Sequence, residues 1–242
     1  MTQASTENNG LGLLPPAGEP ESLYERFHWL YAFCREHLFR DDTGRISAAL
    51  WPAGVPAEGS SLLELGCGPG FYARRLAEHF QHLHVTGIDR SGRQLRRASA
   101  LAAARRLDNC RFEEGDALAL ARPAGSVDTL VSSRLLMVLS EPERAMAEMY
   151  RVLRPGGRCF IAEPRSPLRA AVPLRAMQLL DSLGTLGGEP TRAYREPGSL
   201  YVLDACGFET LIHSQPWSRV RLWQDTWYQY AVCEKGQEQS GP

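Results

Sequence analysis

Lysine is almost absent from this 242-residue chain: Lys235 is the single lysine, and all other basic residues are arginines. We interpret this bias as the mark of a GC-rich coding sequence rather than of anion binding at every arginine. The formal net charge is −1, so no overall positive field would attract nucleic acid or anionic lipid. The charge balance therefore predicts no nucleic-acid partner.

Long apolar runs are also missing. No stretch of about 18 apolar residues occurs, so the sequence predicts no membrane-spanning helix. Residues 1–20 are polar and lack the basic and apolar regions of a secretory signal. We expect a cytoplasmic protein without a membrane partner.

Cysteine motifs are missing as well. The six cysteines include no C-x-x-C pair and no cluster with histidine at metal-ligand spacing. We therefore expect neither a disulfide framework nor a metal site.

Apolar residues recur at spacings of three and four between Leu23 and Leu38, which predicts an aromatic-rich helix over 21–39. A second short helix is expected over 46–51. These helices suggest an N-terminal helical cap over 21–58, preceded by a disordered tail over 1–20. The main domain is expected over 59–235, with a cap insertion around 165–197 and a disordered tail over 236–242.

Strand-like and helix-like segments alternate from residue 60 onward. This βαβα order predicts an α/β domain with a mostly parallel sheet. Strands are expected over 61–65, 83–88, 111–114, 127–132 and 158–162, and helices over 71–80, 91–107 and 141–153. A helix over 200–206, ended by Gly207, is expected to lead into two closing strands over 208–213 and 227–233.

The first strand runs into a glycine-rich loop with Gly66, Gly68 and Gly70. Such a loop brings backbone N–H groups and a helix N-terminus close to a ligand. Glu64, two residues before the first glycine, would repel a pyrophosphate. A dinucleotide fingerprint also needs a third glycine where this chain has Phe71. The loop therefore favours a cationic ligand.

The next two strands each end at an acidic residue, Asp89 and Asp116. A carboxylate at the first position can accept both ribose hydroxyls, and one at the second can face an adenine amino group. Together with the loop, they indicate a cationic adenosyl ligand.

At this point the chain resembles the class I S-adenosylmethionine (SAM)-dependent methyltransferases, in their small-molecule, ubiquinone/menaquinone-methyltransferase-like form. The resemblance covers about residues 60–163. It rests on five segments in the family's order: Leu62 to Gly70, Val85 to Ser91, Glu114 to Ala117, Ser126 to Asp128, and Glu143 to Gly157. It implies a Rossmann-like, seven-stranded, mostly parallel sheet flanked by helices, with the last strand antiparallel.

The resemblance also implies the site. SAM would be the cofactor and S-adenosylhomocysteine (SAH) its product. The cofactor-binding residues carried over are Tyr24, Glu64, Gly66, Cys67, Gly68, Gly70, Asp89, Arg90, Asp116, Ala117, Ser132 and Ser133.

On the acceptor side we select His28 and His213 as candidate bases and Arg134 as a candidate anion contact. With Arg165 and Arg169, Arg134 could form a cationic wall. For each of these side chains an ordinary surface or packing role is the alternative.

The predicted activity is methyl transfer to a small molecule, aromatic or anionic, by a monomer or homodimer. Two alternatives stay open: a nucleotide-dependent oxidoreductase, and a SAM-binding protein without turnover.

Overall fold

The computed structural model describes residues 26–185 and 201–237. Tyr24, the tail over 1–20, the start of the expected N-terminal helix, residues 186–197 of the expected insertion and residues 238–242 lie outside these ranges.

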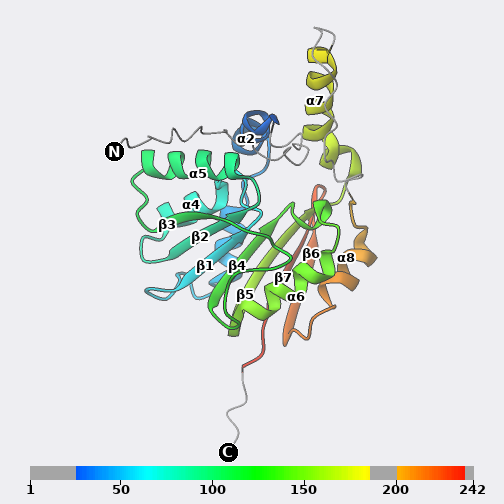
Figure 1. Cartoon of the computed structure of the whole chain (residues 1–242). Helices are drawn as coiled ribbons and strands as arrows, with labels where there is room; N and C mark the ends of the chain where they lie inside the picture. The colour runs from blue at the N-terminus through cyan, green and yellow to red at the C-terminus, as the bar shows by residue number, and fades with distance from the viewer. Residues whose placement is uncertain (1–25, 186–200, 238–242) are drawn as a thin grey trace, which may run out of the picture.

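A single seven-stranded sheet, in the order β3-β2-β1-β4-β5-β7-β6, organises the described residues (Figure 1). Six strands run parallel, and β7 is antiparallel to both of its neighbours. The strands are β1 (Ser61–Leu65), β2 (His84–Asp89), β3 (Cys110–Glu114), β4 (Val127–Ser133), β5 (Leu153–Pro164), β6 (Arg219–Gln224) and β7 (Tyr228–Glu234). The Rossmann-like fold with a reversed last strand is confirmed.

Helices cover both faces of the sheet, since the strands are apolar on both sides. On one face pack α3 (Thr43–Leu50), α4 (Phe71–His79) and α5 (Gly92–Ala104), and on the other pack α6 (Pro142–Val152) and α8 (Ala205–Ile212). Successive side chains of β1 divide between the two layers: Leu62 belongs to the core under α4, and Leu63 to the core under α6.

The prediction of a strand over 208–213 was wrong, because this segment is helix α8. Asp204 caps the helix by accepting a 2.7 Å hydrogen bond from the Gly207 N–H. Gly207 therefore lies in the first turn of α8 and does not end a helix over 200–206. Phe208, Leu211 and Ile212 are buried at helical spacing.

The strand that partners β7 is instead β6, the edge strand of the sheet. In the chain β6 follows α8, and α8 packs against α6. The expected strand over 227–233 is confirmed as β7.

Two further helices, α2 (His28–His37) and α7 (Pro167–Thr185), lie at the edge where the parallel strands end (Figure 1). Leu174 and Met177 of α7 are buried against Phe27, Leu30 and Tyr31. The helix α7 continues through Pro173. The predicted N-terminal helical cap is therefore joined by the segment after β5.

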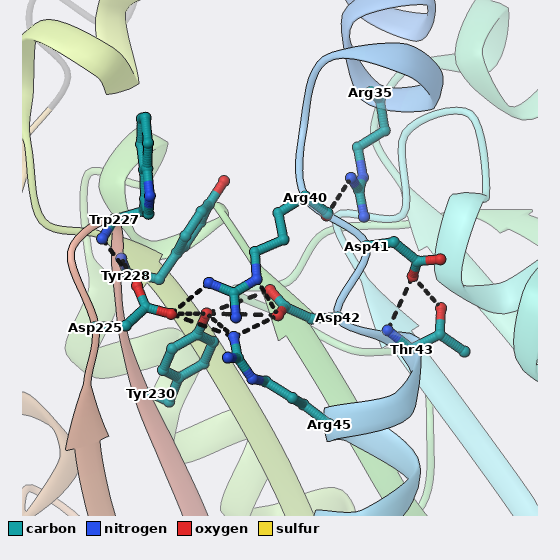
Figure 2. Close-up of polar contacts among 10 residues, drawn as sticks. All are labelled: Arg35, Arg40, Asp41, Asp42, Thr43, Arg45, Asp225, Trp227, Tyr228 and Tyr230. Atoms are coloured by element: carbon teal, nitrogen blue, oxygen red, sulfur yellow. Dashed lines mark hydrogen bonds and ion pairs between the residues drawn. The ribbon is translucent and has the colours of Figure 1, made fainter.

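A cluster of charged side chains fixes the α2–α3 connection to the β6–β7 turn (Figure 2). Arg40 and Arg45 both pair with Asp42 and with Asp225, and the Tyr230 hydroxyl lies 3.1 Å from Asp225 Oδ2. Asp42 and Tyr230 are buried. These contacts therefore join the segment between α2 and α3 to the sheet inside the protein rather than at its surface.

None of the described helices combines the length and apolar composition needed to cross a bilayer. Within the described ranges, no three His, Cys, Asp or Glu side chains gather as a metal site. All six cysteines are free thiols, and Cys159 lies opposite Cys233 across β5 and β7.

Candidate functional site

The loop after β1 holds three glycines in the left-handed region, with φ of 64° at Gly66, 52° at Gly68 and 68° at Gly70. An added Cβ would lie 2.8 Å from Leu135 at Gly66 and 2.5 Å from the Phe112 ring at Gly70. The loop thus needs glycine for its backbone angles and for its close approach to neighbours. Gly70 leads directly into α4, as the sequence predicted.

Asp89, at the end of β2, lies against this loop. Its Oδ2 accepts a 2.8 Å hydrogen bond from the Gly68 N–H, and its Oδ1 accepts a 2.9 Å bond from the Ser91 N–H. The carboxylate is therefore held at a fixed position between the ends of β1 and β2. Both Asp89 and Gly68 line a cavity.

The cavity has a volume of about 240 Å³ and lies at the carboxyl ends of β1 to β4, where ligands bind in open α/β sheets. We call its two ends the Asp89 end, beside β2 and β3, and the Arg134 end, beside β4. Its lining comprises Tyr31, Gly66, Gly68, Ile88, Asp89, Arg90, Ser91, Gln94, Gly115, Ala117, Arg134, Leu135, Met137, Val138 and Leu139.

Six of the predicted site residues line this cavity: Gly66, Gly68, Asp89, Arg90, Ala117 and Arg134. Asp116 is not among the lining residues, although its neighbours Gly115 and Ala117 are. Its Oδ1 accepts a 2.9 Å hydrogen bond from the Leu118 N–H and so closes the turn after β3.

Glu64 also stands back from the cavity. It is buried, and its Oε2 accepts a 2.7 Å hydrogen bond from the Ala73 N–H in the first turn of α4. Burial raises the pKa of this carboxyl to about 7, against the lowering effects of the Ala73 hydrogen bond and of Arg35 and Arg74. Its position ties the start of α4 to β1 and so shapes the loop from behind.

Cys67, Gly70, Ser132 and Ser133 form the support of the site rather than its lining. The Cys67 N–H donates to Ile88 O at 3.0 Å, and burial raises the pKa of the Cys67 thiol. Ser132 is fully buried in β4, with no hydrogen-bond partner for its Oγ among the described residues.

The two predicted bases do not meet at this cavity. His28 begins α2 and is half-buried outside the lining. His213 is exposed at the C-terminal end of α8. The residue Leu203, just before α8, accepts a 2.9 Å hydrogen bond from the Gln229 side chain at the carboxyl edge of the sheet. The helix length separates His213 from that edge.

Sequence reasoning missed much of the Arg134 end. A short 3-10 turn, η1 (Leu136–Val138), supplies Met137 and Val138, which form an apolar wall with Leu139 directly after the turn. Glu163 at the end of β5 fixes this turn, because its Oε1 accepts hydrogen bonds from the Leu135 and Leu136 N–H groups at 2.8 and 2.9 Å. Burial raises the pKa of Glu163 to about 7.

At the Asp89 end, the missed residues are Ser91 and Gln94, in the first turn of α5. Ser91 caps this helix by accepting from the Gln94 N–H. The S-x-x-Q pattern at the end of a strand is a capping signal that could have located both residues.

The chain matches a family described as a methyltransferase domain over residues 56–227, which include the loop, Asp89, Arg134 and the whole cavity wall after β1. It belongs to the class I SAM-dependent methyltransferases. SAM is the cofactor of this family.

Individual relatives agree with this assignment. The chain is 31% identical over 177 residues to a demethylmenaquinone methyltransferase of Deinococcus radiodurans, covering 67% of this chain and 73% of the relative. It is 37% identical over 105 residues to a trans-aconitate 2-methyltransferase of the same organism, covering 43% of this chain and 38% of the relative. The chain spans only between 30% and 48% of the length of three other curated relatives.

Among solved structures, a phosphoethanolamine N-methyltransferase 2 of Haemonchus contortus in complex with SAM has a TM-score of 0.64. The match covers 88% of this chain and 57% of that one at 15% identity. It shows that the fold is shared.

The residues present fit an adenosyl cofactor. A Cβ at Gly68 would come within 3.3 Å of the Tyr31 ring, so a side chain at this position would crowd the part of the cavity that Gly68 and Tyr31 line together. Gln94 lines the cavity and is buried, yet its Oε1 has no hydrogen-bond partner among the described residues. An acceptor atom in that state suits an amino or hydroxyl group of a ligand.

Proposed function

We propose that this chain transfers a methyl group from SAM to a small-molecule acceptor. The observation that carries the proposal is the cavity at the carboxyl ends of β1 to β4, with Asp89 held against the glycine loop at one end and an apolar wall at the other.

In this proposal Asp89 accepts the ribose hydroxyls, and the loop at Gly66 and Gly68 lies against the amino-acid part of the cofactor. Gln94 and Ala117 contact the nucleoside end. Asp116 orders the turn after β3, and Glu64 acts from behind the loop as a positioning residue.

SAM supplies an activated methyl group when bound. The protein's contribution is to hold the acceptor atom about 3–3.5 Å from that methyl group and to exclude water. Tyr31, Met137, Val138 and Leu139 offer apolar contacts for such an acceptor. With neither His28 nor His213 lining the described cavity, we propose that transfer proceeds without a histidine base.

The acceptor is proposed to be a small molecule rather than nucleic acid, supported by the net charge of −1. The names of the relatives suggest acceptors to try: a demethylmenaquinone, trans-aconitate and phosphoethanolamine. We further propose a cytoplasmic monomer or homodimer.

Calorimetric titration with SAM, SAH and NAD tests the cofactor. We expect SAM and SAH to bind at one site per chain and NAD not to bind, because Phe71 stands where a dinucleotide loop needs glycine. Binding of NAD without SAM would support the oxidoreductase alternative and overturn this proposal.

Measuring SAH release with the three named acceptors then tests turnover. SAH above the acceptor-free background with any of them would support the enzyme. Tight SAM binding without turnover across a broad acceptor panel would favour a binding protein.

A further inference from the structure

Arg134 is a cation enclosed at the end of the cavity that faces the cap. It follows β4 directly, and its backbone N–H donates to Ala162 O at 2.9 Å, so it prolongs the β4–β5 pairing. Its φ is +58°, a value that costs a residue with a Cβ about 1 kcal/mol or more. The surrounding structure therefore holds the Arg134 side chain in place despite backbone strain.

The hydrogen-bond and ring contacts of the guanidinium are all with neutral groups. It donates to the Tyr228 hydroxyl and to Ala170 O, both at 3.3 Å, and its Cζ lies 4.4 Å from the centroid of the Phe39 ring. Figure 2 shows the Tyr228 ring pointing away from the Asp42–Asp225 cluster, which leaves its hydroxyl free to receive Arg134.

No carboxylate forms an ion pair with Arg134 among the described residues. Its Nε is buried without a hydrogen-bond partner, and only two of the five N–H groups of an arginine have an acceptor. The nearby Glu163 raises the pKa of Arg134 but makes no ion pair with it among the described residues: its Oε1 accepts from two backbone N–H groups, and its Oε2 has no hydrogen-bond partner. A partly buried cation with so few partners is costly unless an anion completes its contacts.

Four other arginines of this edge, Arg165, Arg40, Arg45 and Arg90, are arranged differently. Arg165, predicted to share a cationic wall with Arg134, is exposed and donates to Asp225 O at 2.8 Å. Arg40 and Arg45 are paired with carboxylates. Arg90 lies at the Asp89 end and is exposed. The side chain of Arg169, the third residue of the predicted wall, lies outside the described residues; of the other two, Arg134 lines the cavity and Arg165 does not.

We propose that Arg134 binds an anionic group, a carboxylate or a phosphate, on the methyl acceptor. This inference rests on the proposed function. The acceptor is assigned because the groups around Arg134 come from the cap and β7, on the side of the cavity opposite Asp89. Because Met137, Val138 and Leu139 form an apolar wall of the cavity, we expect the anionic group to be part of a molecule that is otherwise apolar.

Matched neutral and anionic probes test this directly. Cinnamate, cinnamamide and phenyl phosphate are titrated calorimetrically into the chain, with and without saturating SAH. We expect cinnamate or phenyl phosphate to bind about tenfold or more tightly than cinnamamide, as expected for a charge-assisted contact. The cinnamate and phenyl phosphate arms distinguish a carboxylate acceptor from a phosphate one.

Three variants accompany the probes: Arg134→Met, Arg134→Lys and the control Arg165→Met. Arg134→Met is expected to abolish the preference for the anion and to change SAH affinity less than threefold or so. Arg134→Lys should keep part of the preference, since it keeps the charge but loses the fork of donors. Arg165→Met should behave as the wild type.

Equal binding of cinnamamide and the anions, no binding of either anion at millimolar concentration, or a preference that survives in Arg134→Met would overturn the proposal. So would a loss of SAH affinity of tenfold or more in Arg134→Met, which would assign the guanidinium to the cofactor's own carboxylate. If Arg134→Met does not fold, the wild-type comparison and Arg134→Lys carry the test. Failure of SAH to bind at all would instead contradict the proposed function, and the titrations without SAH would still report on the anion.

Discussion

Gly70 is the residue of the loop with least room for a side chain. A Cβ there would lie 2.5 Å from the Phe112 ring and 3.0 Å from the Ala98 Cβ, at a φ of 68°. We expect Gly70→Ala to lower the free energy of unfolding by about 2–4 kcal/mol, from backbone strain and overpacking together. Urea denaturation measures this change.

Gly44→Ala is the matched control. Gly44 lies in helix α3 with no atom within 4 Å of an added Cβ, so alanine there should be neutral or stabilise by up to about 1 kcal/mol. Equal losses in both variants would contradict the strain assigned to Gly70.

Asp89 is expected to contribute to cofactor binding through charge as well as through loop order. Asp89→Ala removes the acceptor of the Gly68 and Ser91 N–H groups and should weaken SAH binding by about ten- to a hundredfold. Asp108→Ala, at an exposed position after α5, should leave the affinity unchanged. An Asp89→Ala protein that binds SAH like the wild type would remove Asp89 from the site.

At the scale of single residues, the sequence predicted those site residues whose place is set by a backbone turn or by the end of a strand. Gly66, Gly68 and Asp89 line the cavity because strand-to-loop patterns place them there. For Asp116 and Glu64, spacing alone does not reveal that one carboxylate oxygen of each accepts a hydrogen bond from a backbone N–H. The isolation of Arg134 depends on Phe39, Ala170 and Tyr228, which are distant in sequence.

The η1 turn depends on one buried acid, Glu163. Its folded pKa of about 7 lies above the value of about 4.3 expected when unfolded, so the fold favours the protonated acid. The stability that this group contributes is present below pH 4 and is lost as the pH rises through 7.

Glu163→Gln keeps an acceptor for the Leu135 and Leu136 N–H groups but cannot ionise. We expect Glu163→Gln to gain stability relative to the wild type by more than about 1 kcal/mol between pH 5 and pH 8. Urea denaturation at both pH values measures it. If the free energy of unfolding changes equally with pH in the wild type and in Glu163→Gln, Glu163 does not titrate in this way. Glu64, whose pKa is also raised, is present in both proteins and contributes equally to both pH dependences.

The prediction of helices and strands succeeded where the apolar pattern was strong. It failed at 208–213, where a capping residue determines whether the segment is a helix or a strand. The strands β1, β2, β4 and β5 were predicted because buried strands read as apolar runs. The segment over 208–213 has an equally apolar run, but the Asp204 cap starts a helix there. The edge strand β6 was not predicted: all six of its side chains are partly or fully exposed, so it has no apolar run.

At the scale of the whole molecule, cofactor binding should be visible as stability. A ligand that binds only the folded state at about 100 times its Kd adds about 2.7 kcal/mol. For a protein of this size, that corresponds to a rise in Tm of about 5–10 °C. We expect SAH to produce this shift in a thermal melt and NAD at the same concentration to leave Tm unchanged.

The Asp89→Ala variant serves as the control, since the shift should shrink with its affinity. A rise in Tm with NAD and none with SAH would argue for a different nucleotide ligand at this cavity.

The position of β7 has a consequence for how the molecule is made. This strand is the last of those in the described residues, yet it hydrogen-bonds to β5 on one side and to β6 on the other. On a ribosome the Asp89 end needs only residues that emerge early, whereas Arg134 must wait for Tyr228 to be synthesised. Pairings of such long sequence separation form slowly. We therefore expect the Asp89 end of the cavity to form before the Arg134 end during synthesis.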